Sequence, residues 1–394
     1  MWLKFNNRMD MRTSENRYDP VIFISVILLI GLGLIMVYSS SAAIAYQKFN
    51  DPYYFLKRQI FQVIIGGVLM VFFMCLDYHT IQKFTYPALI ITMFLLILVL
   101  FPQFGKKVGG AQRWLHIGSF SFQPSELAKF TLILYVVHSL VKKQERIEDF
   151  FYGYLPNLLV LGFFSILFLF QPDLGTTVVL IAVVFILFFI AGIKFNYLFY
   201  SVVMLLPAIC WVILSSEYQK NRIISFLDPE KDPLGKGYQI IQSFMAFSRG
   251  NAFGIGLGEG RQKLFFLPEP HTDFIFSIIG EELGFAGTVI VVMLFLAIIW
   301  RGIQPAIKSS DLYGTYLSLG LTSLIGVQAM VNLAVAVGLL PTKGLTLPFV
   351  SMGGSSLVVS MICAGVLLNI SKKIGVRNQS SVARVRRVVQ TQRA

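Results

Sequence analysis

The residues best suited to chemistry in this sequence gather where one apolar segment begins. They are Glu269, His271, Asp273, Glu281 and Glu282, and the apolar run that they enter continues to residue 300. A carboxylate at membrane depth costs about 2.5–3.5 kcal/mol, so it requires a partner, a water-filled cavity or a function. On a helix, Glu281 lies about 12 Å beyond Asp273. The pattern predicts the rim and wall of a polar cavity, with a carboxylate available as a general base.

Four apolar segments begin with a proline and a polar cluster. The clusters are Gln123-Pro124-Ser125-Glu126, Gln171-Pro172-Asp173, residues 268–273 with Thr272, and residues 348–356 with Ser351, Gly353, Gly354, Ser355 and Ser356. Proline suits a first helical turn, and Ser, Thr or Asp satisfies the N–H groups there. If these ends converge, their N–H groups and dipoles face one pocket. Lys129 lies one turn after Glu126 on the same helical face, and a lysine inside a span needs a nearby carboxylate.

Two interpretations stay open at this point. A shared functional cavity is favoured because all four clusters fall on the same predicted side of the membrane. Ordinary helix capping with one structural ion pair is the alternative. Arg113 beside Trp114 likewise fits either substrate contact or an anchor at the membrane surface.

Several enzyme classes are excluded by motif. The sequence has no HExxH pattern, no Walker loop and no GxSxG nucleophile elbow, so we expect neither a protein-held zinc nor ATP-driven chemistry. The glycine spacing at residues 254–260 imitates a dinucleotide-binding loop, but no strand precedes it. The remaining parts are a carboxylate base, cations and helix N-termini. They suit group transfer from a phosphate-activated donor without a required cofactor.

The elements that must position these residues are membrane-spanning helices. The chain is 56% hydrophobic and 13% charged, and its apolar runs have the length of about 17–25 residues that a spanning helix needs. We predict an all-α polytopic membrane protein of about ten transmembrane helices with an outward-facing polar cavity. The predicted spans are residues 21–41, 59–76, 85–101, 123–141, 154–170, 174–192, 195–214, 271–300, 312–337 and 354–371.

Charge and loop length predict the topology and the domain boundaries. The net charge is +13, and the C-terminal tail carries seven Lys and Arg residues without an acidic one, so both termini are expected in the cytoplasm. We expect tails at residues 1–20 and 372–394 around a membrane domain at 21–371. The segment 215–270 is predicted to be a long outer loop that acts as a lid or partner surface, and 102–122 a shorter one. A membrane anchor explains the basic tail better than nucleic-acid binding does.

Five motifs carry a family resemblance: residues 110–114, 122–129, 171–176, 267–284 and 340–356. With these motifs the chain resembles the SEDS family of bacterial cell-wall polymerases, which comprises the RodA, SpoVE and FtsW proteins. Lys343 in the last motif resembles the division-type members, FtsW, more than the elongation-type members, RodA. Met352 stands where the family commonly has a tyrosine.

The resemblance implies a peptidoglycan glycosyltransferase that polymerises lipid II. Asp273 matches the essential acidic position of the family and would act as the base. We expect Lys129, Arg113 and Lys343, in that order, to bind the diphosphate, with Glu126 holding Lys129. Asp173 is expected in the cavity wall, and Glu281 and Glu282 in structural roles. A divalent cation could accompany the diphosphate.

The resemblance also implies partners and a location. A class B penicillin-binding protein, other division proteins and membrane lipid are the expected partners, at the division septum in the bacterial cytoplasmic membrane. A lipid II flippase and a non-catalytic division scaffold are the alternatives. A flippase would need access to its cavity from both leaflets, whereas the polar clusters crowd the outer ends. A scaffold would leave Asp273 and Lys129 without a purpose.

Overall fold

The computed structural model describes residues 18–108, 111–117, 120–215, 217–229, 237–264, 266–268, 270–308, 311–342 and 344–372. Most of both predicted tails therefore lies outside the described residues, as do Glu269 and Lys343.

Each of the ten predicted spans coincides with a helix. The helices are α1 (Pro20–Phe49), α2 (Tyr54–Cys75), α4 (Thr85–Leu100), α5 (Pro124–Lys142), α6 (Leu155–Phe170), α7 (Leu174–Ile190), α8 (Phe195–Ser215), α11 (Ile275–Lys308), α12 (Leu312–Ala336) and a last helix (Ser355–Lys372). Within the described residues six helices are long and apolar enough to cross a membrane, and α4, α7 and the first part of α8 are shorter apolar helices. The chain is a helical membrane protein, as predicted.

Helix α5 lies in the interior of the bundle. It packs against α4, α6, α7 and α12, and both Glu126 and Lys129 are buried within it. Neighbouring helices shield such charged residues from lipid, which is where ionisable side chains are found in membrane proteins. The position of α5 therefore explains how a helix with a buried charged pair can lie within the membrane domain.

The two segments predicted to be loops are more ordered than expected. Residues 102–122 contain an antiparallel sheet of β1 (Gly105–Val108), β2 (Ala111–Ile117) and β3 (Phe120–Phe122), in that order. Residues 215–270 contain α9 (Glu217–Leu227) and α10 (Tyr238–Gly250). The sequence did not reveal these elements, because short strands and single amphipathic helices leave weak periodic signals. The remaining short elements are α3 (Tyr78–Lys83), a 3₁₀-helix at Gln144–Arg146 and a π-helix at Phe150–Tyr154 that leads into α6.

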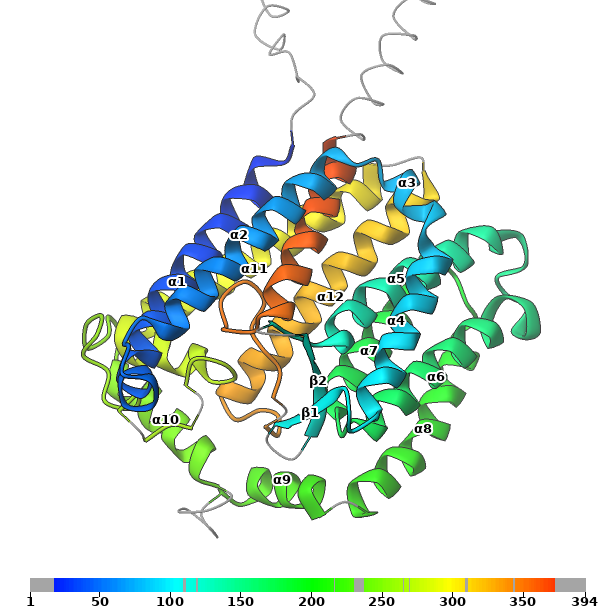
Figure 1. The fold of residues 1–394 in the computed structure, drawn as a ribbon. Coiled ribbons are helices and arrows are strands. Elements are labelled where there is room, and N and C mark those ends of the chain that lie inside the picture. Colours follow the sequence, from blue (N-terminus) through cyan, green and yellow to red (C-terminus); the bar gives the residue numbers. More distant parts are fainter. Residues whose placement is uncertain are drawn as a thin grey trace, which may run out of the picture.

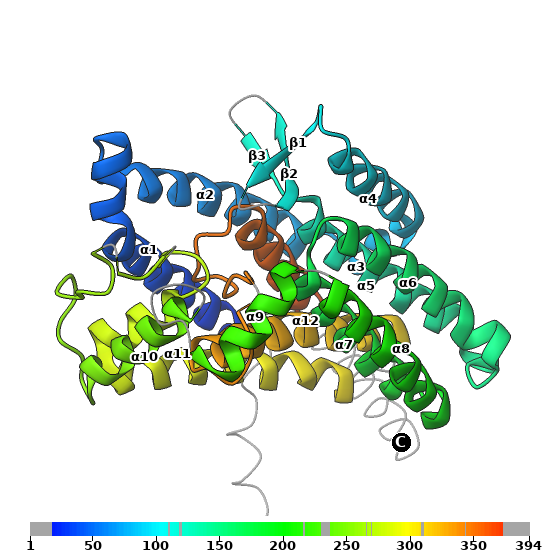
Figure 2. The ribbon, with the colours of Figure 1, turned by 90° about the horizontal axis from the view of Figure 1, so that it is seen from below.

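The two ends of the described chain meet at one end of the bundle. The Asp19 backbone N–H donates to Ser371 Oγ at 3.2 Å, and Lys372 Nζ donates to Tyr18 OH at 3.4 Å. The sheet, α9 and α10 lie toward the opposite end (Figure 1). Figure 2 looks onto that end and shows α9 and α10 lying across it. All four polar clusters are carried toward this second end.

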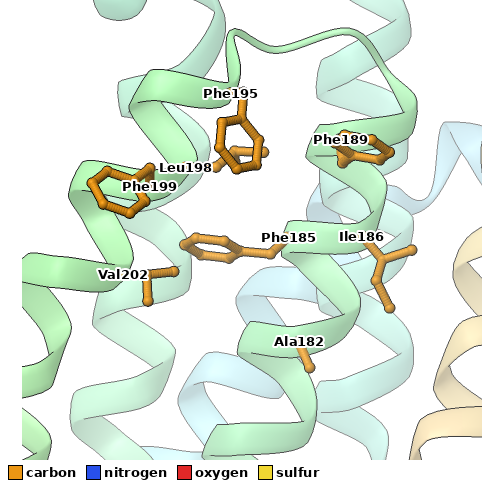
Figure 3. A pocket seen from close by; sticks show the side chains of 8 residues that line it. All are labelled: Ala182, Phe185, Ile186, Phe189, Phe195, Leu198, Phe199 and Val202. Carbon is orange, nitrogen blue, oxygen red and sulfur yellow. The ribbon is translucent and has the colours of Figure 1, made fainter.

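An apolar groove separates α7 from α8. It has a volume of about 370 Å³ and is lined only by hydrophobic side chains, among them Phe185, Phe189, Phe195 and Phe199. Figure 3 shows the Phe185 and Phe195 side chains lying between the two helices. The groove is near the C-terminal end of α7, whereas Asp173 caps its N-terminal end. It is therefore separate from the polar clusters.

Candidate active site

The turn before α11 carries Asp273 and is held by the segment before the last helix. We call residues 270–274 the acidic turn and residues 344–354 the closing loop. The Met352 N–H donates to His271 O at 3.0 Å, and Ser351 Oγ donates to Thr272 O at 2.7 Å. These bonds use the backbone of the acidic turn, so they fix its path without engaging the Asp273 carboxylate.

Asp273 is half-buried and lies against a glycine of the closing loop. Its Oδ2 is 3.5 Å from the point where a Cβ on Gly344 would stand, and Gly344 has a φ of +66°. Glycine adopts this left-handed backbone without steric cost. A side chain at Gly344 would be strained and would also crowd the carboxylate.

Helix α5 carries the buried ion pair that its sequence suggested. Lys129 Nζ lies 2.8 Å from Glu126 Oε2, and the lysine side chain is only 1% exposed. Lys129 also donates to Gln328 Oε1 at 2.7 Å. A cavity of about 10 Å³ beside the pair has room for about one water molecule. The ammonium is therefore committed to protein atoms and is not presented to a large ligand in this conformation.

Gln328 of α12 joins this pair to the start of the last helix. Its Nε2 donates to Thr346 O at 3.1 Å and to Ser356 Oγ at 3.3 Å. Asn332, one turn further along α12, donates from Nδ2 to Asp273 O at 3.0 Å and also to Leu345 O. One face of α12 thus connects the acidic turn, the closing loop and the Glu126–Lys129 pair.

The start of α5 also contacts the start of the last helix. The Gln123 N–H donates to Ser355 Oγ at 2.9 Å. A Cβ added to Gly353 would come within 2.9 Å of Thr346 Cγ2, so the absence of a side chain lets the closing loop fold tightly onto itself. Three of the four predicted polar clusters are therefore brought together, those of α5, α11 and the last helix.

The fourth cluster, at α7, is tied to the sheet instead. Arg113 of β2 donates from Nε to Gln171 O at 3.0 Å and from Nη2 to Pro172 O, and its Nη1 lies 3.9 Å from Asp173 Oδ1. Asp173 is buried and caps α7 by accepting from the Thr176 N–H at 3.2 Å. Arg113 thus clamps the start of α7, and no contact among the described residues links it to Asp273.

Glu281 and Glu282 attach an outer segment to α11. We call residues 254–264 the glycine-rich segment. Lys263 Nζ lies 2.7 Å from Glu282 Oε1 and donates to Ser39 Oγ at 2.9 Å. The Arg261 N–H donates to Glu281 Oε1 at 3.0 Å. Both carboxylates therefore have structural partners, and the segment that leads into the acidic turn is fixed to α1 and α11.

Sequence reasoning missed Gln328, Asn332, Ser39 and Lys263 as parts of the site. A signal for the first two was present, because amide side chains spaced by one helical turn inside an apolar span mark an inward polar face. Ser39 and Lys263 left no comparable signal, since their pairing joins residues far apart in the chain. Glu269 and Lys343, which were predicted here, lie outside the described residues.

Comparison with known proteins matches nearly the whole chain. The model of the FTSW_RODA_SPOVE family, described as cell cycle protein, matches residues 20–375. The chain is 45% identical over 364 residues to the probable peptidoglycan glycosyltransferase FtsW of Geobacter sp. (strain M18), covering 92% of this chain and 99% of that protein. It is 42% identical over 362 residues to the stage V sporulation protein E of Bacillus subtilis (strain 168), with the same coverage of 92% and 99%.

Solved structures show the same fold. The structure described as "Structural coordination of polymerization and crosslinking by a peptidoglycan synthase complex" superposes with a TM-score of 0.75 at 30% identity, covering 91% of this chain and 98% of that one. The rod shape determining protein RodA of Thermus thermophilus superposes with a TM-score of 0.66 at 27% identity, covering 90% and 96%. The chain therefore belongs to the FtsW/RodA/SpoVE family of cell cycle proteins, which confirms the resemblance seen in its motifs.

Proposed function

We propose that this protein is a peptidoglycan glycosyltransferase that joins lipid II units into β-1,4 glycan strands during cell division. The observation that carries the proposal is the fixed acidic turn, in which a half-buried Asp273 is held through its backbone by Asn332, while bonds from the closing loop fix the neighbouring residues. The names of the FtsW relatives support the same activity. A fixed backbone supports this role, because a general base must be positioned against the proton that it takes.

In the proposed reaction Asp273 accepts the proton of the acceptor sugar's 4-hydroxyl. The hydroxyl oxygen forms a bond to the donor's anomeric carbon, whose bond to the diphosphate oxygen breaks on the opposite face. The electron pair leaves with undecaprenyl diphosphate, and the α-linked donor becomes β-linked by inversion. A positioned base contributes typically about 10²–10⁴-fold to such a rate.

We assign positioning roles to two of the cations expected at the diphosphate. Lys129 and Arg113 give their donors to protein atoms, so they support the site through the α5 and α7 starts. Lys343 is retained as a diphosphate ligand on the family motif alone. We propose that any divalent cation enters with the diphosphate, as part of the substrate.

We also propose the partner and the setting. A class B penicillin-binding protein would cross-link the product, and the match to a peptidoglycan synthase complex supports such a partner. The membrane domain, residues 21–371, would lie in the cytoplasmic membrane at the septum. The meeting of the two chain ends supports a common side for both tails, which the basic C-terminal tail assigns to the cytoplasm.

The test is polymerisation of purified lipid II by this protein and by Asp273→Asn, each alone and with a partner penicillin-binding protein whose own glycosyltransferase domain is absent. Glycan strands from the native protein and none from a folded Asp273→Asn are expected. If neither protein makes polymer with the partner bound, the polymerase proposal fails. Lipid II transport across vesicles would then be measured to test the flippase alternative.

A further inference from the structure

The first turns of α2 lie beside the acidic turn, although the sequence predicted no functional cluster there. The Phe55 and His271 rings are 4.7 Å apart between centroids. Gln62 Nε2 is 3.1 Å from the point where a Cβ on Gly354 would stand. One face of α2 therefore contacts both the acidic turn and the start of the last helix.

Arg58 lies on this face, between the two contacts. It follows Phe55 by three residues and precedes Gln62 by four, which is the spacing of neighbours on one helical face. Its Nη2 donates to Ser121 Oγ of β3, and β3 leads directly into the start of α5. Arg58 is thus located where the acidic turn, the sheet and the last helix come together.

Arg58 differs from the other cations of the site in what it contacts. Within the described part of the chain it donates to one hydroxyl and forms no ion pair, and it is half-buried. Lys129 and Arg113 instead face carboxylates and carbonyls. A guanidinium has five donors, so Arg58 retains most of its hydrogen-bonding capacity for a ligand.

The glutamines beside Arg58 provide a second observation. Gln59 is 1% exposed, and the Oε1 atoms of Gln59 and Gln62 accept no hydrogen bond from the described residues. Buried polar atoms are nearly always satisfied, so such acceptors indicate a place for a polar ligand or ordered water. A cation with donors to spare therefore lies close in sequence to two amide oxygens that no described residue satisfies, on the helix whose first turns contact the acidic turn.

We propose that Arg58 binds the diphosphate of the polyprenyl-linked donor, an inference that rests on the proposed glycosyltransferase function. The planar guanidinium matches two phosphate oxygens at once. When the bond between the anomeric carbon and the diphosphate oxygen breaks, the electron pair remains on that oxygen, and Arg58 stabilises the charge that develops there.

The neighbouring Lys57 offers a matched control. It is on the same turn of α2, but its side chain is 68% exposed and pairs with Asp51 at 2.7 Å. This hydrogen bond from Lys57 holds the pKa of Asp51 below its ordinary value. Arg58→Gln and Lys57→Gln thus each remove one positive charge from the same helical turn, one inside the site and one outside.

The experiment measures initial polymerisation rates against lipid II concentration for the native protein, Arg58→Gln, Arg58→Lys and Lys57→Gln. We expect Arg58→Gln to lower kcat/KM by roughly 10- to 100-fold, because a hydrogen-bonded charge contact is lost. Arg58→Lys should recover part of the loss, since it keeps the charge without the planar fork. Lys57→Gln should match the native protein.

A binding measurement separates this inference from the proposed function. Undecaprenyl diphosphate and undecaprenyl monophosphate are titrated in detergent against the native protein and the same variants, each shown to be folded by thermal unfolding. The inference is supported if the native protein binds the diphosphate more tightly than the monophosphate and only Arg58→Gln loses this difference. This result would support the inference even if no variant polymerises lipid II. Equal binding by Arg58→Gln and Lys57→Gln, or equal kcat/KM values, would overturn it while leaving the glycosyltransferase proposal intact.

Discussion

Gln328 and Asn332 lie one turn apart on α12 and together join the proposed base to the buried ion pair. Asn332 donates to the backbone of Asp273, and Gln328 accepts from Lys129. Both amides also donate to the closing loop. One turn of a helix is stiff, so Gln328 and Asn332 move together. Movement of the acidic turn is therefore coupled to movement of α5 through these two side chains.

Replacing Asn332 by leucine is expected to impair both stability and catalysis. The buried carbonyl of Leu345 and the partly buried carbonyl of Asp273 would lose this donor, and a buried group left unsatisfied costs about 1–3 kcal/mol. The acidic turn would then be held less firmly, so kcat should fall more than KM changes. Thermal unfolding and initial rates of lipid II polymerisation measure the two effects.

Asn157→Leu is the matched control for Asn332→Leu. Asn157 is buried in α6 and donates to Gly153 O at 2.8 Å, away from the acidic turn. It should lower the unfolding temperature without changing the activity of the folded protein. Equal losses of kcat in both variants would show that Asn332 acts only through general stability.

Removing only one partner of the Glu126–Lys129 pair is expected to destabilise the folded protein strongly. Lys129→Met leaves the Glu126 carboxylate buried without its cation, a change that typically costs about 3–5 kcal/mol. Adding Glu126→Gln should recover much of the unfolding temperature, because no buried charge then remains. If Lys129 has a positioning role, the double variant also regains measurable polymerisation. A double variant that folds like the native protein but stays inactive would show that the substrate needs the ammonium itself.

Replacing two glycines of α1 by alanine should change the stability of the protein in opposite directions. A Cβ on Gly33 would lie 2.7 Å from Val350 O of the closing loop, whereas one on Gly31 meets nothing within 4 Å. Gly33→Ala should therefore destabilise the protein by about 1–3 kcal/mol through overpacking and lower the polymerisation rate. Gly31→Ala should stabilise it by about 0.5–1 kcal/mol. Unfolding temperatures of the two variants test this, and a neutral Gly33→Ala would contradict the close helix-to-loop contact.

Lys263→Met is expected to release the glycine-rich segment from α11. Glu282 would lose its ion pair and Ser39 its donor, so amide hydrogen exchange across residues 254–264 should accelerate. Lys194→Met, which removes an exposed lysine 3.6 Å from Glu148, should leave exchange there unchanged, since surface pairs contribute about 0–1 kcal/mol. Unchanged exchange in Lys263→Met would show that the backbone bonds to Glu281 suffice.

The fold could be predicted largely because hydrophobic length determines where helices cross a membrane. All ten predicted spans contain a helix, and the local spacing of Glu126 and Lys129 predicted their contact. Local spacing cannot show which distant segments meet. The partners of Arg113 lie 58 and more residues away, and Lys263 reaches a serine 224 residues before it. Arg58 was likewise hidden, because its importance arises only from tertiary contacts, whereas the spacing of the α12 amides did carry a signal that was overlooked.

The meeting of Asp19 with Ser371 imposes a parity rule on this chain. If both tails lie in the cytoplasm, as we propose, the chain crosses the membrane an even number of times, so spanning helices can be added or removed only in pairs unless one tail changes sides. One extra hydrophobic helix fused after Lys372 would therefore carry any attached reporter to the far side. Because Asp19 and Ser371 adjoin, a short linker that joins these two residues in place of the tails would close the helical bundle into a ring, which suits the bundle to circular permutation.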